Sequence, residues 1–243
     1  MILNTIYQKI KEKKKIFSLL IDPDKYTPEE LKETLDIAVK NQVDLLLIGG
    51  SLISKNLNIT INQIKQICNI PVLLFPGSCL QISDCADGIL FLSLISGRNP
   101  DLLIGSHVVA APMIRNAGLE ILPTGYILIN GKNATSVQYM SNTTPIPPDK
   151  IDIITATAMA GEMLGLKLIY LEAGSGAIEP INPNIINEVK KCINLPIIVG
   201  GGLKDTKTLT NILEAGADMV VVGNAIENEK KILEKLIKTT KNF

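Results

Sequence analysis

Short apolar runs alternate along the chain with longer segments of helical periodicity. Eight of these runs have strand character, and they lie at residues 16–21, 43–48, 71–75, 88–96, 119–129, 166–171, 195–200 and 219–222. Strands that alternate with helices pair in parallel, and eight such units close into a barrel. The pattern therefore predicts an α/β protein, a (β/α)8 TIM barrel that forms a single domain over residues 1–243.

The segments between the runs carry helix signals. The clearest start is at Thr27, a capping residue, followed by Pro28 in the first turn and by Glu30, which completes a capping box. Asn182 and Asp205 stand at two later helix starts. Helices are expected after Thr27 and Asn182, and over residues 5–12, 59–68, 100–117, 149–164, 205–216 and 225–240.

Two connections depart from the regular alternation. About ten residues, 77–87, separate the third and fourth runs, whereas a crossover helix with its loops takes about a dozen or more. We therefore expect a modified barrel whose third crossover helix is reduced or absent, which opens a groove on that flank; a short helix is the alternative. Gly131-Lys132-Asn133 predicts that the fifth strand returns as a hairpin through residues 136–140.

The charge balance and the cysteine content exclude several classes of protein. Lysine plus arginine equals aspartate plus glutamate at 24 each, so the net charge gives no indication of a nucleic-acid partner. Four cysteines without a close pair, and His107 as the single histidine, argue against a zinc site and for reduced thiols in the cytoplasm. No apolar stretch reaches the ~20 residues that cross a bilayer. A soluble protein is expected. Transient contact with a membrane is compatible with this expectation, because a soluble enzyme can act on a lipid substrate.

Three consecutive strands end in glycine. The segments are 168–176 (LIYLEAGSG), 195–202 (LPIIVGGG) and 219–225 (MVVVGNA). Glycine lets the backbone approach a phosphate without a Cβ in the way, and the amides that follow face the anion. The pattern predicts a phosphate site at the mouth of the barrel, formed by Gly201, Gly202, Gly223 and Asn224; turns selected for their geometry alone are the alternative.

Oxygen ligands for a cation follow the first two strands. Asp22 comes where the first strand meets its loop, and Ser51 lies at the equivalent point after the second strand. A carboxylate and a hydroxyl with several waters suit Mg²⁺, which often bridges to substrate phosphates. Asp24 is a second candidate ligand. The alternative for Asp22 is an Asx turn before a helix.

Tyr170 and Glu172 share a face of the sixth strand, so both are expected to point into the barrel. A buried glutamate beside an alcohol serves as a general base, and a hydrogen-bonding anchor without proton transfer is the alternative. Arg98 follows the fourth strand, where its planar fork suits a diphosphate; a surface residue is the alternative. His107 is expected to pack on a helix face, and contact with a diphosphate is the alternative.

Taken together, these motifs resemble the geranylgeranylglyceryl phosphate synthase family, which also includes bacterial heptaprenylglyceryl phosphate synthases. The pattern is closer to the archaeal and Bacteroidetes-type branch. Bacillus-type members carry a lysine two residues before the first aspartate, whereas this chain has Leu20, so that phosphate contact is absent or replaced. The resemblance is carried by Asp22-Pro23-Asp24-Lys25, Gly49-Gly50-Ser51, Asn99 through His107, Tyr170 through Gly176, Gly201-Gly202 and Gly223-Asn224.

The resemblance implies a prenyltransferase of lipid metabolism. It would form the ether bond between the 3-hydroxyl of sn-glycerol 1-phosphate and a polyprenyl diphosphate, taken to be geranylgeranyl diphosphate, with Mg²⁺ held by Asp22 and Ser51. It also implies a dimer or hexamer. Tyr170 and Glu172 are the catalytic candidates, and Arg98, Asn99 and His107 the diphosphate contacts. The glycerol phosphate would be held by Tyr170, Leu171, Glu172, Ala173, Gly174, Ser175, Gly176, Gly201, Gly202, Gly223 and Asn224.

Two other classes of function use the same phosphate site. A barrel isomerase or lyase for a small sugar phosphate predicts a small closed pocket without a long apolar flank. A non-catalytic phosphate sensor predicts binding without transfer and leaves Asp22, Ser51 and Glu172 without a shared purpose.

Overall fold

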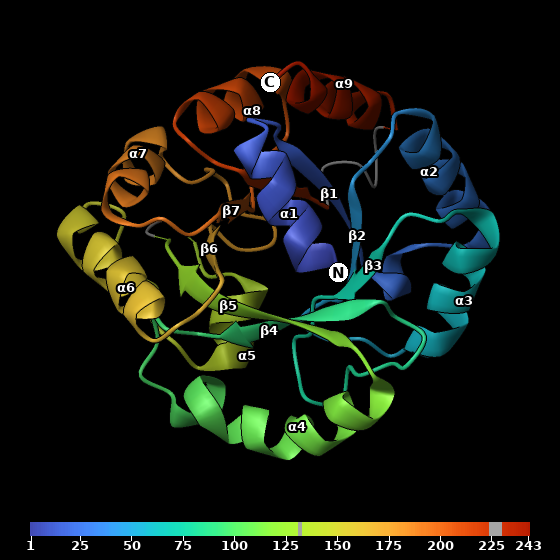
Figure 1. Cartoon of the computed structure of the whole chain (residues 1–243), viewed down its shortest axis with the longest axis horizontal. Coiled ribbons are helices and arrows are strands. Elements are labelled where there is room, and N and C mark those ends of the chain that lie inside the picture. Colours follow the sequence, from blue (N-terminus) through green and yellow to red (C-terminus); the bar gives the residue numbers. More distant parts are fainter. Residues whose placement is uncertain (131–132, 224–229) are drawn as a thin grey trace.

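Eight parallel strands form a closed ring, and helices cover it on the outside (Figure 1). The structure is a computed structural model that describes residues 1–130, 133–223 and 230–243. Each strand pairs with its neighbours in sequence, and β1 pairs with β8 to close the barrel. The predicted α/β barrel is therefore confirmed. The strands are β1 (Ile16–Ile21), β2 (Leu45–Ile48), β3 (Val72–Leu74), β4 (Gly88–Ser93), β5 (Glu120–Leu128), β6 (Leu168–Glu172), β7 (Ile197–Gly200) and β8 (Met219–Val222).

Apart from α5, the helices lie where the periodic segments predicted them, with ends that differ by a few residues; the predicted start of the last helix at residue 225 lies outside the described residues. Thr27 and Glu30 form the predicted capping box, and the side chains of Asn182 and Asp205 cap the helices that follow them. None of the helices in the described residues is long and apolar enough to cross a membrane. The elements are α1 (Ile2–Lys11), the 3₁₀ turn η1 (Pro23–Lys25), α2 (Pro28–Lys40), α3 (Leu57–Ile67), the π-helical turn η2 (Asp101–Gly105), α4 (Ser106–Ala117), α5 (Ser136–Ser141), α6 (Ile151–Met163), α7 (Pro183–Cys192), α8 (Thr206–Glu214) and α9 (Lys230–Lys241).

The side chains of each strand divide between two apolar layers. On β6, Ile169 and Leu171 pack in the outer layer between the strands and the helices, whereas Leu168 and Tyr170 lie in the inner layer. Residues of the same parity therefore share one environment, as alternation along a strand requires. Tyr170 consequently points into the barrel, as its position in the sequence predicts.

The connection from β3 to β4 contains no helix, so the predicted gap in the outer ring is confirmed. Residues 75–87 run as turns across this flank, between α3 and α4 (Figure 1). The side chain of Gln81 fastens the connection, since it accepts a hydrogen bond from the Gly77 amide and donates one to the Gly50 carbonyl, both at 2.9 Å. The wall of the barrel is thus thinner here than on any flank that a crossover helix covers.

The predicted hairpin after β5 is wrong. Residues 136–140 lie in the short helix α5, and the turn at Gly131 and Lys132 lies outside the described residues. The physical reason is closure, because β5 already pairs with β4 on one side and with β6 on the other. No free edge remains on β5 to accept an antiparallel partner.

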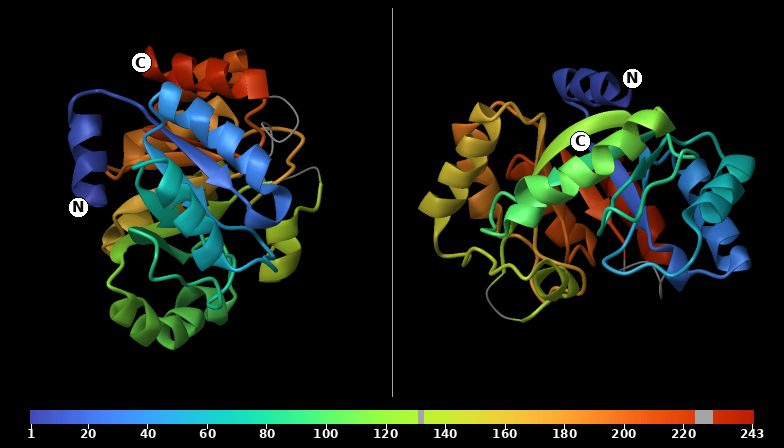
Figure 2. Two further views of the ribbon diagram at one scale, coloured as in Figure 1. Left: turned by 90° about the vertical axis from the view of Figure 1, so that its right-hand side faces the viewer. Right: turned by 90° about the horizontal axis from the view of Figure 1, so that it is seen from below.

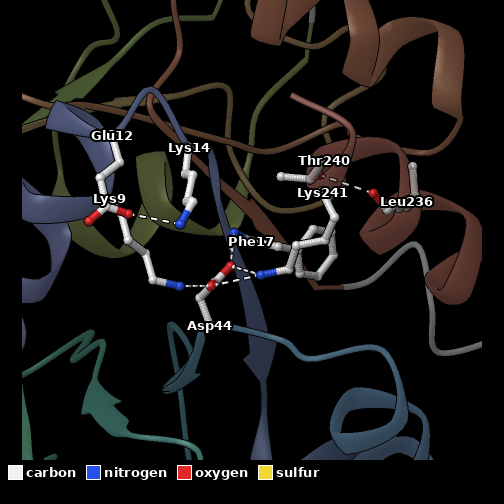
Figure 3. Close-up of polar contacts among 8 residues, drawn as sticks. All are labelled: Lys9, Glu12, Lys14, Phe17, Asp44, Leu236, Thr240 and Lys241. Atoms are coloured by element: carbon white, nitrogen blue, oxygen red, sulfur yellow. Dashed lines mark hydrogen bonds and ion pairs between the residues drawn. The ribbon is translucent and has the colours of Figure 1, made fainter.

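The end of the barrel opposite α5 is covered by α1 (Figure 2). Asp44 precedes β2 and links α1 to α9. Its buried carboxylate accepts hydrogen bonds from Lys9 of α1 and from Lys241 of α9, the latter at 2.7 and 2.8 Å (Figure 3). The same carboxylate accepts from the Phe17 amide of β1 at 2.8 Å. We call this group of four residues the Asp44 cluster; it ties the first strand pair to helices from both ends of the chain.

Candidate active site

A cavity of about 950 Å³ opens at the carboxyl ends of the strands. Its polar part lies under the loops that follow β1, β2, β6 and β7, and beside Gly223 at the end of β8. Its apolar part extends toward α4 and the β3–β4 connection, where no helix stands in the way. The polar part is lined by Asp22, Lys25, Ser51, Tyr170, Glu172, Ser175, Gly176, Gly201, Gly202, Lys204 and Gly223. The apolar part is lined by Ile82, Ile89, Phe91, Ala110 and Ile114.

Glu172, the last residue of β6, is the buried acid of this cavity. Its Oε1 accepts a hydrogen bond from the Gly174 amide at 2.6 Å, and its carboxyl also bonds to the side chains of Tyr170 and Tyr126. Burial raises the pKa of Glu172 to about 7, although the three hydrogen bonds favour the ionised form and act in the opposite direction. A carboxyl that titrates near neutrality can take up and release a proton under physiological conditions.

Three aromatic rings pack together in the barrel interior, and two of them carry the hydroxyls that bond to this carboxyl. Phe75, just beyond β3, stacks on Tyr170 with ring centroids 5.4 Å apart, and Tyr126 of β5 lies 5.1 Å from Tyr170. Burial raises the pKa of both tyrosine hydroxyls well above the usual value, and the nearby charge of Glu172 raises them further. Both hydroxyls therefore stay protonated and act as hydrogen-bond donors.

The glycines after β7 leave room that no other residue would leave. A Cβ atom on Gly201 would stand 2.6 Å from Glu172 Oε1, and both Gly201 and Gly202 have positive φ, at 82° and 72°. The loop after β6 is similar, with positive φ at Gly174 and Gly176. The backbone of these loops can therefore approach a ligand closely, as the sequence predicts.

Not all of the predicted glycerol phosphate contacts present their side chains to the cavity. Leu171 and Ala173 belong to the outer apolar layer, so only their backbone atoms face the loop. Gly223 lines the cavity beside Leu20, whose side chain would stand 3.3 Å from a Cβ at position 223. Asn224 lies outside the described residues.

Asp22 and Ser51 both line the cavity, from neighbouring strands. Asp22 Oδ1 accepts from the Asp24 amide at 3.1 Å, so the Asx turn that was the alternative is present. The second oxygen, Oδ2, stands 3.9 Å from Lys25 Nζ. Burial raises the pKa of Asp22, against the opposing effects of the Asp24 amide and Lys25. The turn thus uses one carboxylate oxygen and leaves the other toward the cavity.

The donor set of this corner fits a cation that takes most of its ligands from water and substrate. Asp24 is committed elsewhere, since its oxygens accept from the amides of Ser54 and Lys55 at 2.7 and 2.9 Å. Within the described part of the chain, no three His, Cys, Asp or Glu side chains gather as a metal site. One carboxylate and one hydroxyl are nevertheless a typical partial set for Mg²⁺, which keeps several waters and binds phosphate oxygens.

The three predicted diphosphate contacts do not come together. The exposed Arg98 donates to the Gly97 carbonyl at 2.8 Å and lines an outer groove beside α6 instead of the cavity. Asn99 Nδ2 donates to the Ser141 carbonyl at 3.0 Å, which fastens α5. Only His107 lines the cavity, with Nε2 3.1 Å from Ser93 Oγ and its ring edge-on to Phe91. Burial lowers the pKa of His107, against the Leu92 carbonyl, so the ring is neutral at physiological pH.

Several cavity residues were not predicted from the sequence as site residues. Lys25 and Lys204 bring the positive charge that Arg98 does not bring. Their signals were present, because Lys25 ends the Asp22-Pro23-Asp24-Lys25 motif and Lys204 follows the glycines after β7. Tyr126 gave no such local signal, since its meeting with Glu172 depends on the register between β5 and β6.

A barrel with an anion-binding glycine rim, a buried carboxyl and an apolar extension defines the class: a (β/α)8 enzyme for a phosphorylated substrate with an apolar partner. The chain belongs to the PcrB family, whose sequence model matches residues 7–242.

Individual relatives agree with this assignment. The chain is 48% identical over 238 residues to a geranylgeranylglyceryl phosphate synthase of Chitinophaga pinensis, with 96% of this chain and 94% of the relative covered. An archaeal enzyme of the same name from Methanosphaera stadtmanae is 40% identical, with 98% and 97% covered. Among solved structures, (S)-3-O-geranylgeranylglyceryl phosphate synthase of Thermoplasma acidophilum, in complex with its substrate sn-glycerol-1-phosphate, superimposes with a TM-score of 0.93 at 29% identity, covering 99% and 98%.

Proposed function

We propose that this chain is a prenyltransferase that joins sn-glycerol 1-phosphate to a polyprenyl diphosphate through an ether bond. The observation that carries the proposal is the two-part cavity, with a buried carboxyl and glycine rim at one end and an apolar extension at the other. The names of the PcrB relatives, among them an enzyme with bound sn-glycerol-1-phosphate, support the choice of substrates. A small sugar phosphate would leave the apolar part empty.

The glycerol phosphate is assigned to the polar part. The amides of the loops after β6 and β7 face its phosphate, and Ser175, Lys204 and Gly223 line the same region. Lys204 gives a positive charge to the cavity that is also lined by Leu20, the position where Bacillus-type members would carry a lysine. The glycerol hydroxyls then lie toward Glu172 and Tyr170, at the base of the loop.

Bond formation requires a proton acceptor. The glycerol 3-hydroxyl oxygen attacks C1 of the prenyl chain while the bond from C1 to the diphosphate oxygen breaks, and the hydroxyl proton passes to Glu172. The diphosphate leaves with the bonding electron pair. A Glu172 pKa of about 7 suits this role, because the carboxylate is available near neutral pH and still basic enough to accept the proton.

The departing diphosphate carries most of the developing negative charge. Mg²⁺, held by Asp22 and Ser51, would supply charge neutralisation there when bound. Lys25 adds a cationic side chain from the same corner of the cavity. The neutral His107 can contribute a hydrogen bond but no charge.

The prenyl chain is assigned to the apolar part of the cavity. On the order of twenty carbons at about 0.8 kcal/mol per buried CH₂ give a large gross driving force. The missing crossover helix between β3 and β4 makes this extension sterically accessible. The length of product is therefore set by how far the extension continues along α4.

Transfer assays test the proposal directly. Purified protein is incubated with sn-glycerol 1-phosphate, Mg²⁺ and geranyl, farnesyl, geranylgeranyl or heptaprenyl diphosphate, and the products are analysed by mass spectrometry. We expect a prenyl ether, with a preference for one donor length, and loss of product when a chelator removes Mg²⁺. The mirror-image sn-glycerol 3-phosphate is the matched control. No ether with any donor, together with turnover of a sugar phosphate, would instead support the isomerase or lyase class.

We also propose a homo-oligomer in the cytoplasm. The outer faces of α4 and α6 expose Val108, Val109, Met113, Met163 and Leu164, each by more than half of its surface, which a second subunit would cover. The four cysteines are free thiols, as a reducing compartment maintains them. Sedimentation velocity distinguishes a monomer from a dimer or hexamer, and Val109→Glu should shift the equilibrium toward the monomer.

A further inference from the structure

Two tyrosines, on two neighbouring strands, converge on one carboxyl group. In the register between β5 and β6, Tyr126 lies beside Tyr170, and Leu128 lies beside Glu172. Both tyrosine side chains point into the barrel interior, and Tyr170 lies two residues before Glu172 on the same face of β6. Tyr170 belongs to the predicted glycerol phosphate site, whereas no motif gives Tyr126 a role.

We propose that Tyr126 is a positioning residue, whose hydroxyl holds the Glu172 carboxylate ionised and oriented to receive the proton of the substrate alcohol. The proposal rests on the proposed function, since it assigns Tyr126 a task in the same proton transfer. Tyr126 itself does not need to touch the substrate. It acts through Glu172.

The first argument is the number of hydrogen-bond sites on the carboxylate. An ionised carboxylate has about four lone-pair directions for donors. The Gly174 amide takes one at Oε1, and the hydroxyls of Tyr126 and Tyr170 take two more. About one direction is left, and Glu172 lines the cavity, so the open direction is available to a ligand hydroxyl. Without Tyr126 the carboxyl has one restraint fewer, and a second direction opens.

The second argument is the rigidity of the donor. The Tyr126 ring is 5.1 Å from Tyr170 and 6.2 Å from Phe75, measured between centroids, and only 7% of the residue is exposed. A ring held in this way costs little further entropy when its hydroxyl forms a hydrogen bond. Phenylalanine at position 126 keeps these ring contacts and removes the hydroxyl alone.

The third argument concerns charge. Burial opposes the ionised form of Glu172, and among the described residues the groups that counteract it are the Gly174 amide and the two tyrosine hydroxyls. The charged or titratable groups that line the same cavity from other elements are Asp22 and Lys25 after β1, Cys79 in the β3–β4 connection, His107 on α4, Tyr139 on α5 and Lys204 after β7. Removal of the Tyr126 hydroxyl leaves the burial cost less opposed, so the Glu172 pKa should rise further.

The test is Tyr126→Phe in the full-length protein, with two independent measurements. The first is the titration of the Glu172 side-chain carbon by ¹³C NMR without substrates, assigned by its absence in Glu172→Gln; we expect a higher pKa in Tyr126→Phe. The second is the pH profile of kcat for prenyl transfer. A first unit of pKa rise above 7 should lower the rate at pH 7 about fivefold, and each further unit about tenfold, with recovery at higher pH.

Tyr139→Phe is the matched control, because Tyr139 also lines the cavity but is 85% exposed on α5. It should move neither the carbon titration nor the pH profile. An unchanged Glu172 titration in Tyr126→Phe, or a rate loss that is equal at all pH values, would overturn the positioning role. Absence of prenyl transfer in the unmodified protein would instead refute the proposed function, and the NMR titration would still decide whether Tyr126 controls the carboxyl.

Discussion

The hydroxyl of Tyr170 occupies the space that a Cβ atom on residue 200 would need. Gly200, the last residue of β7, is the neighbour of Glu172 in the register of β6 and β7. The tyrosine ring is fixed from the other side by the stacked ring of Phe75. Tyr170 can therefore reach Glu172 only because its neighbouring strand ends in a residue without a side chain.

Gly200→Ala should displace the Tyr170 ring and weaken both the fold and the site. Overpacking of a well-packed interior costs about 1–3 kcal/mol, so we expect a loss of that size in the free energy of unfolding by urea. Transfer activity should fall strongly as well. In Gly200→Ala combined with Tyr170→Phe, part of the stability should return, because the most crowded atom is gone; a purely additive double variant would contradict this direct contact.

Glu172→Gln should separate binding from chemistry. The amide keeps nearly the same shape and can still accept from the Gly174 amide, but it cannot take up a proton. We expect kcat to fall by about 10²–10⁴-fold, with binding of sn-glycerol 1-phosphate changed little in calorimetry. Unchanged turnover would remove Glu172 from the role of base, and equal losses in binding and turnover would make it an anchor.

The same residue should make the fold less stable as the pH rises. The folded pKa of Glu172 is about 7, above the ordinary 4.5, so the folded state holds its proton more tightly than the unfolded state does. The contribution of Glu172 to the free energy of unfolding is therefore greatest below pH 4.5 and is lost as the pH rises to about 7. The difference amounts to about 3 kcal/mol at 1.36 kcal/mol per pKa unit.

Urea unfolding at several pH values measures this effect against Glu172→Gln, which does not titrate there. Relative to that variant, the free energy of unfolding of the unmodified protein should fall by about 3 kcal/mol between pH 4.5 and pH 7. Above pH 7 the difference between the two proteins should stay constant. A constant difference between the two proteins across this window would show that the carboxyl is not perturbed.

Asp44→Asn should reduce stability without changing the chemistry. The Asp44 side chain is 4% exposed and receives two lysines that are each 32% exposed, so the pairs are partly shielded from solvent. We expect a loss of about 2 kcal/mol in unfolding free energy, and an unchanged kcat per folded molecule, since the Asp44 cluster lies at the opposite end of the barrel from the cavity. Asp149→Asn is the control, because Asp149 is 70% exposed beside Lys150 and should contribute almost nothing.

Ala110→Phe should shorten the products. Ala110 lies on α4, is 6% exposed and lines the apolar part of the cavity, with Ile114 one turn further from the mouth. A phenyl group there would fill the extension. We expect the preferred donor to become shorter, with activity toward geranyl diphosphate retained, in competition assays that contain donors of several lengths. A proportional loss with every donor would place the prenyl chain elsewhere.

The strands and most helices were predictable because their signals are local. The apolar run at Ile16–Ile21 is observed with the same limits, and the capping box at Thr27 needs only its own four residues. The failure at residues 136–140 was not local. Whether a strand has a free edge depends on the closure of the whole ring, which no short segment records.

The site residues also divide into those with a local sequence signal and those that depend on contacts between distant segments. The inward direction of Tyr170 and Glu172 follows from parity on a single strand, and glycine at the ends of β7 and β8 can be read directly. The meeting of Tyr126 with Glu172 requires the register between segments 46 residues apart, from Tyr126 to Glu172. The position of Arg98 similarly depends on how its loop folds beside α6. The sequence therefore suggested a cation for the main cavity, whereas the Arg98 side chain lines the outer groove.

The Asp44 cluster also bears on how the chain matures during translation. β1 obtains its second partner only when β8 has emerged, and Asp44 receives Lys241 only after α9 has been synthesised. Before β8 is available, a sheet formed by the earlier strands would have two unpaired edges. Protection of the growing polypeptide by ribosome-bound chaperones is therefore expected to matter more for this protein than for one whose early segments complete a domain by themselves.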